Sequence, residues 1–194
     1  AVRVGNPDPV AFRTEVGTPF EKYFSIVNGA AHWKIITKCL LRLGELGTDP
    51  LALTAETCRQ HNVLLVASFR MNDNHLGQDQ YMAHDFGRQH PQWRIPGTGL
   101  MDPAVPEVFE HRMQLFREAA ENYDIDGIEF DFMRWNHMIS EPSKNHSILT
   151  KMVAEIRRML DEAAKRNSAT NMNIGTGDVI QNDAGKDTGF VLMA

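Results

Sequence analysis

The hydrophobic positions of this chain predict an alternation of strands and helices. Residues 63–69 form a continuous apolar run, which is typical of a strand buried on both faces of a parallel sheet. Three further strands are predicted, at residues 23–27, 125–132 and 171–175. Apolar residues at helical spacing, with Asp49 and Pro50 as a helix start, predict helices at residues 33–46, 49–62, 106–123 and 148–165. The predicted order is therefore β-α-α-β-α-β-α-β.

This order predicts an α/β protein with right-handed crossovers and a mostly parallel sheet. Two architectures fit it, an open doubly wound sheet or part of a TIM-type (β/α)8 barrel. The glycine fingerprint of dinucleotide-binding folds is absent, which favours the barrel. A complete barrel takes about 250 residues, whereas this chain has 194. We therefore expect residues 1–194 to form a single TIM-barrel-like catalytic domain that is incomplete, because half a barrel leaves two open edges.

Composition and charge narrow the classes of partner. The chain is 42% hydrophobic and 23% charged, as in globular domains. Its net charge of −5 gives no basic footprint for nucleic acid or an anionic membrane. No apolar run approaches the roughly 20 residues that span a bilayer, and the first ten residues lack the pattern of a secretory signal. We expect neither a nucleic-acid partner nor membrane insertion.

Polar residues gather where the predicted strands end. They are Asn28 after the first strand, Arg70, Asn72, Asp73 and His75 after the second, and Glu129, Asp131, Arg134 and Trp135 in and after the third. The carboxyl ends of parallel strands meet at one edge of a sheet, where ligands bind in this class of fold. The sequence therefore predicts a binding site at this edge, although the residues around Asn72 also suit a polar loop that caps the next element.

Strict alternation within residues 127–132 separates the two faces of the third predicted strand. The apolar side chains point one way, and Glu129 and Asp131 point the other. Two carboxylates on the inner side of a sheet are costly unless they meet cations, hydrogen-bond donors or a polar substrate. Arg70 or Arg134 can supply the positive charge. The alternative is a buried ion-pair network that only fixes the strand.

Other chemistry is less well supported by the sequence. The histidines His84, His90 and His111 are scattered, and no HxH or HExxH spacing indicates a metal centre. No Gly-x-Ser-x-Gly elbow is present. Trp93 suits either sugar stacking or the anchoring of a loop. We expect no cofactor.

The stretch YDIDGIEFDFMRW at residues 123–135 resembles a motif of glycoside hydrolase-like (β/α)8 barrels, a largely bacterial family assigned as glycosyl hydrolases. DPAVPEV at residues 102–108 and SFRMND at residues 68–73 are also similar to that family. The similarity covers about residues 20–140, and the acidic motif is its most specific part. The resemblance implies a barrel, a carbohydrate substrate and a carboxylate mechanism.

The working hypothesis is hydrolysis of a poly- or oligosaccharide by two carboxyl groups that flank the glycosidic bond. Asp131 is the first candidate, because it lies nearest the end of its strand. Glu129 is better suited to orient Asp131 or to bind a hydroxyl. The partner acid should come from another strand, and Asp73 is one candidate, an acid beyond Ala194 another. Whether the enzyme retains or inverts the anomeric configuration stays open.

The remaining strand-end residues would line the sugar subsite, namely Asn28, Arg70, Asn72, His75, Arg134 and Trp135. Two alternatives stay open: a carbohydrate-binding barrel without catalysis, and a metal-assisted hydrolase that uses Asp73, His75, Glu129 and Asp131 as ligands. A polysaccharide substrate suggests a secreted or periplasmic protein, but no residue specifies the compartment. The sugar and the oligomeric state are likewise unspecified.

Overall fold

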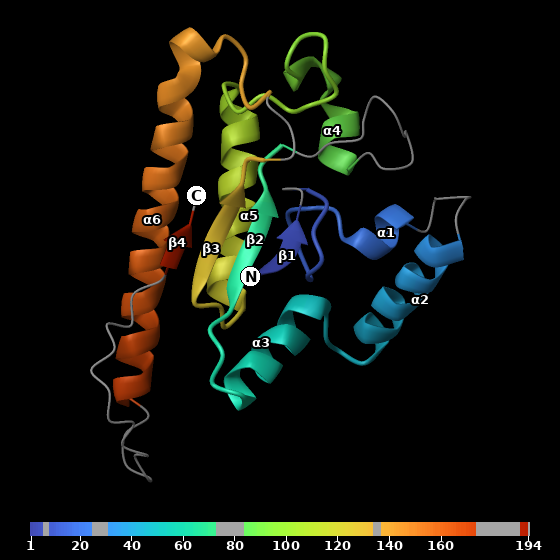
Figure 1. Cartoon of the computed structure of the whole chain (residues 1–194), viewed down its shortest axis with the longest axis vertical. Coiled ribbons are helices and arrows are strands. Elements are labelled where there is room, and N and C mark those ends of the chain that lie inside the picture. The colour runs from blue at the N-terminus through green and yellow to red at the C-terminus, as the bar shows by residue number, and fades with distance from the viewer. Residues whose placement is uncertain (6–7, 25–30, 73–83, 134–136, 174–190, 194) are drawn as a thin grey trace.

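The computed structural model describes residues 1–5, 8–24, 31–72, 84–133, 137–173 and 191–193. It confirms the α/β class, with a parallel four-stranded sheet in the order β1-β2-β3-β4 (Figure 1). The strands are β1 (Val2–Gly5), β2 (Val66–Arg70), β3 (Gly127–Asp131) and β4 (Val191–Met193). Because all four strands run in the same direction, their carboxyl ends share one edge of the sheet.

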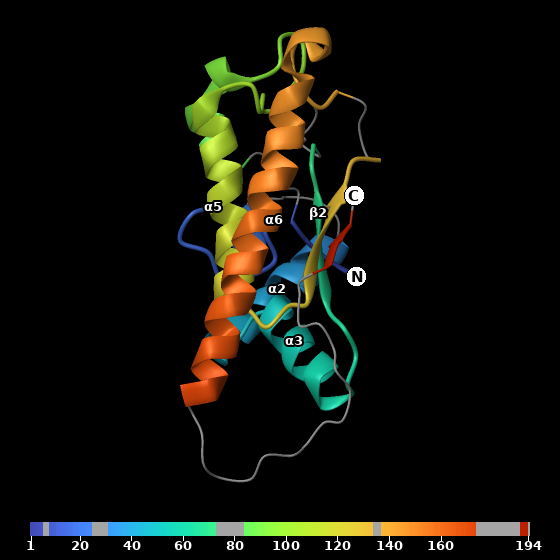
Figure 2. The ribbon, with the colours of Figure 1, turned by 90° about the vertical axis from the view of Figure 1, so that its left-hand side faces the viewer.

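Helices connect these strands. They are α1 (Phe20–Phe24), α2 (Ala31–Glu45), α3 (Pro50–Gln60), α4 (Asp85–Gln89), the short 3-10 helix η2 (Pro91–Trp93), α5 (Pro106–Asn122) and α6 (Pro142–Asn173). Figures 1 and 2 show α5 and α6 side by side against one face of the sheet. No described helix lies in front of β2 and β3 on the opposite face, which we call the uncovered face. Among the described residues, no helix combines the length and apolar character needed to cross a bilayer.

The core lies between the sheet and helices α5 and α6. Phe116 of α5 sits between Phe69 of β2 and Phe130 of β3, with ring centroids 4.9 and 5.3 Å away in edge-to-face geometry. All three rings are fully buried. Burying one such side chain is worth about 1.5–3 kcal/mol relative to leaving it exposed. This contact fixes which face of the sheet the helices cover.

The strongly periodic segments were predicted correctly. Helix α3 begins at Pro50 with Asp49 as its N-cap, whose carboxylate accepts a hydrogen bond from the Ala52 backbone at 2.9 Å. The predicted helix at 106–123 is α5, and its predicted apolar face is buried around Val108, Met113 and Phe116. The predicted helix at 148–165 lies within the longer α6.

The strand predicted at residues 23–27 is wrong for residues 23 and 24, which belong to helix α1. Phe20, Tyr23 and Phe24 are spaced as one face of a helix, and this periodicity outweighs the β-propensity of the aromatic residues. Residues 25–27 lie outside the described part.

The strand predicted at residues 171–175 is wrong for residues 171–173, which continue α6. Extending an existing helix adds one hydrogen bond per residue without a new nucleus. The fourth strand is instead β4, next to β3. The strand predicted at residues 63–69 corresponds to β2, which begins only at Val66. Val63 and Leu64 precede the strand, and their side chains are exposed. Strand β1 was not predicted, although Val2 and Val4 alternate with Arg3.

Candidate functional site

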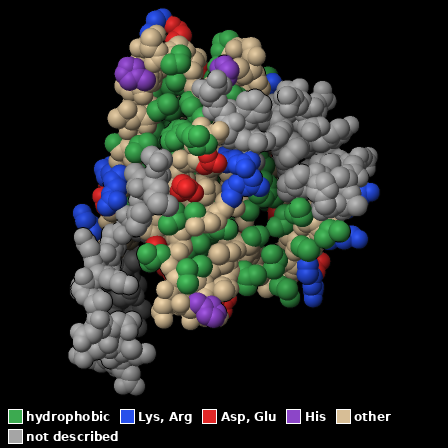
Figure 3. All heavy atoms as spheres, in the orientation of Figure 1, with side chains coloured by type: hydrophobic (Ala, Val, Ile, Leu, Met, Phe, Trp, Pro, Cys, Tyr) green, Lys and Arg blue, Asp and Glu red, His purple; other side chains and the backbone are tan. Residues whose placement is uncertain are grey.

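The uncovered face of the sheet carries the predicted carboxylates. Ile128 and Phe130 of β3 are buried in the core beneath the helices. Glu129 and Asp131 alternate with them and are half-buried on the uncovered face. Basic and acidic side chains meet near the middle of this face (Figure 3). The predicted alternation is therefore confirmed.

Arg70 and Asp131 form the most defined contact on this face. They are register partners at the carboxyl ends of β2 and β3, and Arg70 Nε lies 3.6 Å from Asp131 Oδ2. The other carboxylate oxygen, Oδ1, accepts a hydrogen bond of 2.9 Å from the backbone N–H of Met133. The side chains of Arg70 and Asp131 are 25% and 31% exposed. Asp131 thus has a hydrogen bond on one oxygen and a positive charge close to the other, and it still reaches solvent.

Glu129 lies one pleat deeper than Asp131, within a row that crosses the sheet. Its register partners are Ser68 on β2 and Met193 on β4, and Ser68 in turn pairs with Arg3 on β1. Neighbouring strands are about 4.8 Å apart, so the Ser68 position separates the Glu129 and Arg3 positions. This row contains a basic, a hydroxyl and an acidic side chain, and it lies one pleat further from the carboxyl edge than the Arg70–Asp131 pair.

Asn72 is buried in the interior and does not lie on the uncovered face, where the sugar subsite was predicted. Its side chain is buried; its amide donates to the backbone carbonyl of His137, and its Oδ1 accepts from Arg112 Nη2 at 3.4 Å. Arg112 is itself buried and also donates to the Met101 carbonyl at 3.2 Å. Burial lowers the pKa of Arg112 to about 10, while the charge of Asp102 acts in the opposite direction. Asn72 therefore serves an interior network that joins β2 to α5.

The other predicted site residues, Asn28, Asp73, His75, Arg134 and Trp135, lie outside the described residues. The structure thus brings together Arg70, Glu129 and Asp131, and it separates Asn72 from them. Within the described ranges, no three His, Cys, Asp or Glu side chains are grouped so that they could hold a metal ion.

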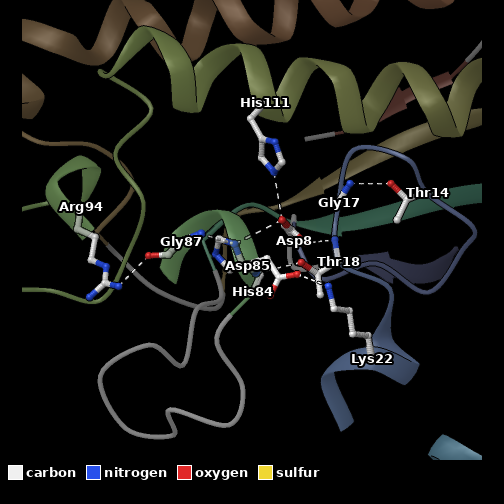
Figure 4. Close-up of polar contacts among 10 residues, drawn as sticks. All are labelled: Asp8, Thr14, Gly17, Thr18, Lys22, His84, Asp85, Gly87, Arg94 and His111. Atoms are coloured by element: carbon white, nitrogen blue, oxygen red, sulfur yellow. Dashed lines mark hydrogen bonds and ion pairs between the residues drawn. The ribbon is translucent and has the colours of Figure 1, made fainter. Parts of the chain in front are cut away.

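A second polar cluster was not predicted from the sequence. Asp8, in the loop after β1, is buried beside two histidines (Figure 4). Its Oδ2 lies 3.1 Å from His111 Nε2 on α5 and 3.4 Å from His84 Nδ1 at the start of α4. Its Oδ1 accepts from the Thr18 backbone at 2.7 Å. These contacts join four segments at the carboxyl edge of the sheet.

The charge state of Asp8 follows from these contacts. Burial alone would raise the pKa of the carboxyl, but the His111 and His84 rings and the Thr18 N–H lower it by more. The pKa of Asp8 therefore lies well below its usual value, and the group is a carboxylate at neutral pH. The signal available in the sequence was the strand β1, which would have placed Asp8 at the predicted ligand-binding edge.

A contact network extends this cluster to α1 and η2. The Thr18 hydroxyl accepts from the Asp85 backbone at 3.1 Å, and the Asp85 side chain pairs with Lys22 at 2.5 Å. On the other side, Arg94 Nη2 donates to the Gly87 carbonyl at 2.8 Å. Figure 4 shows α4 held between these two contacts. The cluster thus fixes the position of a helix too short to be stable alone.

Comparison with known protein families and with curated proteins does not assign this chain to a family. No model of a known protein family matches it, and no curated protein is similar to it at the level searched.

Proposed function

We propose that this chain is part of a (β/α)8-barrel glycoside hydrolase that cleaves a poly- or oligosaccharide with two carboxyl groups. The observation that carries the proposal is the pair of acids on the uncovered face, Glu129 and Asp131, with Asp131 beside Arg70 at the carboxyl edge. In a barrel this face is the interior, and the carboxyl edge is where substrates bind. The parallel order of the four strands is compatible with this architecture.

The contacts of Asp131 favour one of the two catalytic roles. Its Oδ1 accepts a hydrogen bond from the Met133 backbone, and the Arg70 guanidinium lies close to its Oδ2. These two contacts hold the carboxylate in one orientation at the edge of the sheet. Asp131 is therefore suited to act as nucleophile or general base, and the proton donor is an acid on another strand. Asp73 remains the candidate within this chain.

Arg70 then has a different role from the sugar contact that the sequence suggested. Its guanidinium lies beside Asp131, with Nε 3.6 Å from Oδ2, so it acts as a positioning residue for the carboxylate. Glu129, one pleat below, is suited to bind a sugar hydroxyl or to orient its neighbours. A hydroxyl-rich ligand also suits the mixture of donors and acceptors in the Arg3–Ser68–Glu129 row.

The test is hydrolysis of a panel of oligosaccharides by the full chain, followed by reducing-end release and mass spectrometry. Asp131→Asn should lower turnover by about 10²–10⁴-fold, the usual contribution of a catalytic acid or base. Asp161→Asn is the matched control, because Asp161 is half-exposed on α6 and pairs only with Arg157 among the contacts described. An Asp131→Asn variant with unchanged turnover contradicts the assignment. Binding of a saccharide without cleavage by the unmodified chain would instead indicate a carbohydrate-binding barrel.

A further inference from the structure

One nitrogen of His84 contacts two partners that make opposite demands on it. His84 Nδ1 lies 3.0 Å from the backbone N of Gly87 and 3.4 Å from Asp8 Oδ2 (Figure 4). The Gly87 N–H is a donor, so it requires a lone pair on Nδ1. The Asp8 carboxylate is an acceptor, so it requires a proton on the same atom. A ring nitrogen carries one or the other at any time.

With a neutral ring, Nδ1 accepts from Gly87 and caps α4. His84 is the N-cap residue of this helix, and its ring takes the place of the Ser, Asp or Asn oxygen that usually accepts there. Asp8 needs no proton from His84 in this state, because His111 Nε2 lies within hydrogen-bond distance at 3.1 Å and Thr18 donates at 2.7 Å. In this state both Asp8 and Gly87 keep regular hydrogen bonds.

With a protonated ring, the preference reverses. Nδ1 now carries a hydrogen and donates to the buried carboxylate, which gives a charge-assisted bond in a site with little water. The Gly87 N–H loses its acceptor, and a backbone donor in a buried position is costly to leave unpaired. The first turn of α4 therefore has to rearrange, or Gly87 has to find water.

We propose that His84 is a proton-operated cap of α4, which holds the helix when neutral and releases its first turn when protonated. The chemistry of the two contacts carries this inference, and it does not depend on the proposed hydrolase activity. Histidine suits such a device because its unperturbed titration lies near pH 6.5. No other common N-cap side chain changes from acceptor to donor in this range.

The charges around the cluster set the direction of the response. Asp8 in the loop after β1 offers an acceptor to a protonated ring, and His111 on α5 competes with His84 for the same oxygen. The Lys22–Asp85 pair between α1 and α4 is partly exposed, so solvent screens it. Arg94, beyond η2, holds the Gly87 carbonyl and opposes movement of α4 as a whole. The response is therefore expected at the first turn rather than across the helix.

Aromatic contacts connect this turn to the neighbouring surface. Phe86 stacks on the His111 ring with centroids 3.8 Å apart, and Trp93 stacks on His90 at the same distance. Phe86 also contacts Trp93, with centroids 5.5 Å apart. A change at residues 84–87 is therefore transmitted to Trp93, which provides a fluorescence signal in addition to backbone resonances.

The experiment is a two-dimensional NMR titration of the ¹⁵N-labelled full chain between pH 8 and pH 5. We expect His84 Nδ1 to change from an unprotonated acceptor nitrogen to a protonated one. The Gly87 amide resonance should move with the same midpoint, and its hydrogen-exchange protection should fall on the acidic side. A Gly87 amide that stays unchanged while His84 titrates overturns the proposal, and so does a His84 ring that stays neutral throughout.

Two variants and a control separate the cap from general effects of pH. His84→Asn keeps an N-cap acceptor that does not titrate, so Gly87 should stay protected and the pH response should vanish. Asp8→Asn removes the carboxylate to which a protonated Nδ1 would donate, so Gly87 should lose less protection on the acidic side. His146→Gln changes an exposed histidine on α6 and should leave the response intact. A Gly87 response that persists in His84→Asn assigns the effect to another group and refutes the inference.

Discussion

Arg70 and Asp131 are register partners on adjacent parallel strands, and the Arg70 Nε atom lies 3.6 Å from Asp131 Oδ2. Both residues end their strands and alternate with the buried Phe69 and Phe130, which places their side chains on the face opposite the core. The pair is only partly buried, so solvent reduces its contribution to folding. It lies at the carboxyl edge of a parallel sheet, where ligands bind in this class of fold, so the proposed function makes the pair a target for mutation.

We first predict that Arg70→Gln impairs the proposed hydrolysis without unfolding the protein. Turnover should fall at least about tenfold, which corresponds to about 1.4 kcal/mol of lost transition-state stabilisation. The loss should fall on kcat more than on KM, because Arg70 positions the carboxylate rather than holding the substrate. The free energy of unfolding should change by less than about 1 kcal/mol. Turnover assays over a range of substrate concentrations, with urea unfolding of the same samples, measure both effects.

The matched control for Arg70 is Arg157→Gln, which removes the exposed ion pair between Arg157 and Asp161 on α6. It should leave both kcat and KM unchanged. If the two arginine variants behave alike in activity, Arg70 does not position Asp131.

A second prediction concerns Asn72, which the sequence suggested as a sugar ligand. Asn72→Ala should lower the free energy of unfolding by about 1–3 kcal/mol, because buried Arg112 and the His137 carbonyl each lose a hydrogen-bond partner. Urea unfolding followed by circular dichroism measures this loss. Gln114→Ala, on the exposed side of α5, is the control. A variant as stable as the control argues against the interior network.

The elements that were predicted correctly are those in which burial of one face produces a periodic pattern of apolar residues. Helices α5 and α6 and strand β3 bury one face each, and that burial imposes the period of 3.6 or 2 on their apolar residues. Side-chain alternation alone therefore placed Glu129 and Asp131 on the correct face. The partnership of Arg70 with Asp131 was accessible because both end a strand, and parallel strands end together.

The parts that the sequence did not predict depend on contacts between distant segments. Asp8 and His111 are 103 positions apart, and nothing in the local sequence of either indicates the other. Asn72 has the composition of a polar loop residue, and only the buried Arg112 explains its inward orientation. Short elements were also missed. Strand β1 and helix α4 have four and five residues, which is too short for a periodic pattern of apolar residues to be recognised.

A third prediction follows from the lowered pKa of Asp8. A carboxyl whose folded-state pKa lies below its ordinary value of 3.8 stabilises the protein above that value, and the stabilisation is lost as pH falls toward the folded-state pKa. Asp8→Asn should therefore be less stable than the unmodified chain by about 1.5–3 kcal/mol at neutral pH. The gap should shrink below about pH 4. Urea unfolding at a series of pH values tests this, with the half-exposed Asp161→Asn as the control. A gap that does not change with pH refutes the carboxylate's role.

The last prediction concerns the contact that sets which face of the sheet stays uncovered. Phe116 is fully buried between Phe69 and Phe130, so Phe116→Ala should cost about 3–5 kcal/mol through lost burial and a residual cavity. Leu53→Ala removes an apolar side chain that is 46% exposed on α3 and should cost well under half as much. Denaturant unfolding compares the two. Because Phe116 holds α5 against β2 and β3, its removal should also diminish hydrolysis in proportion to the unfolded fraction. An intact fold with activity lost would instead place Phe116 closer to the reaction than the core position allows.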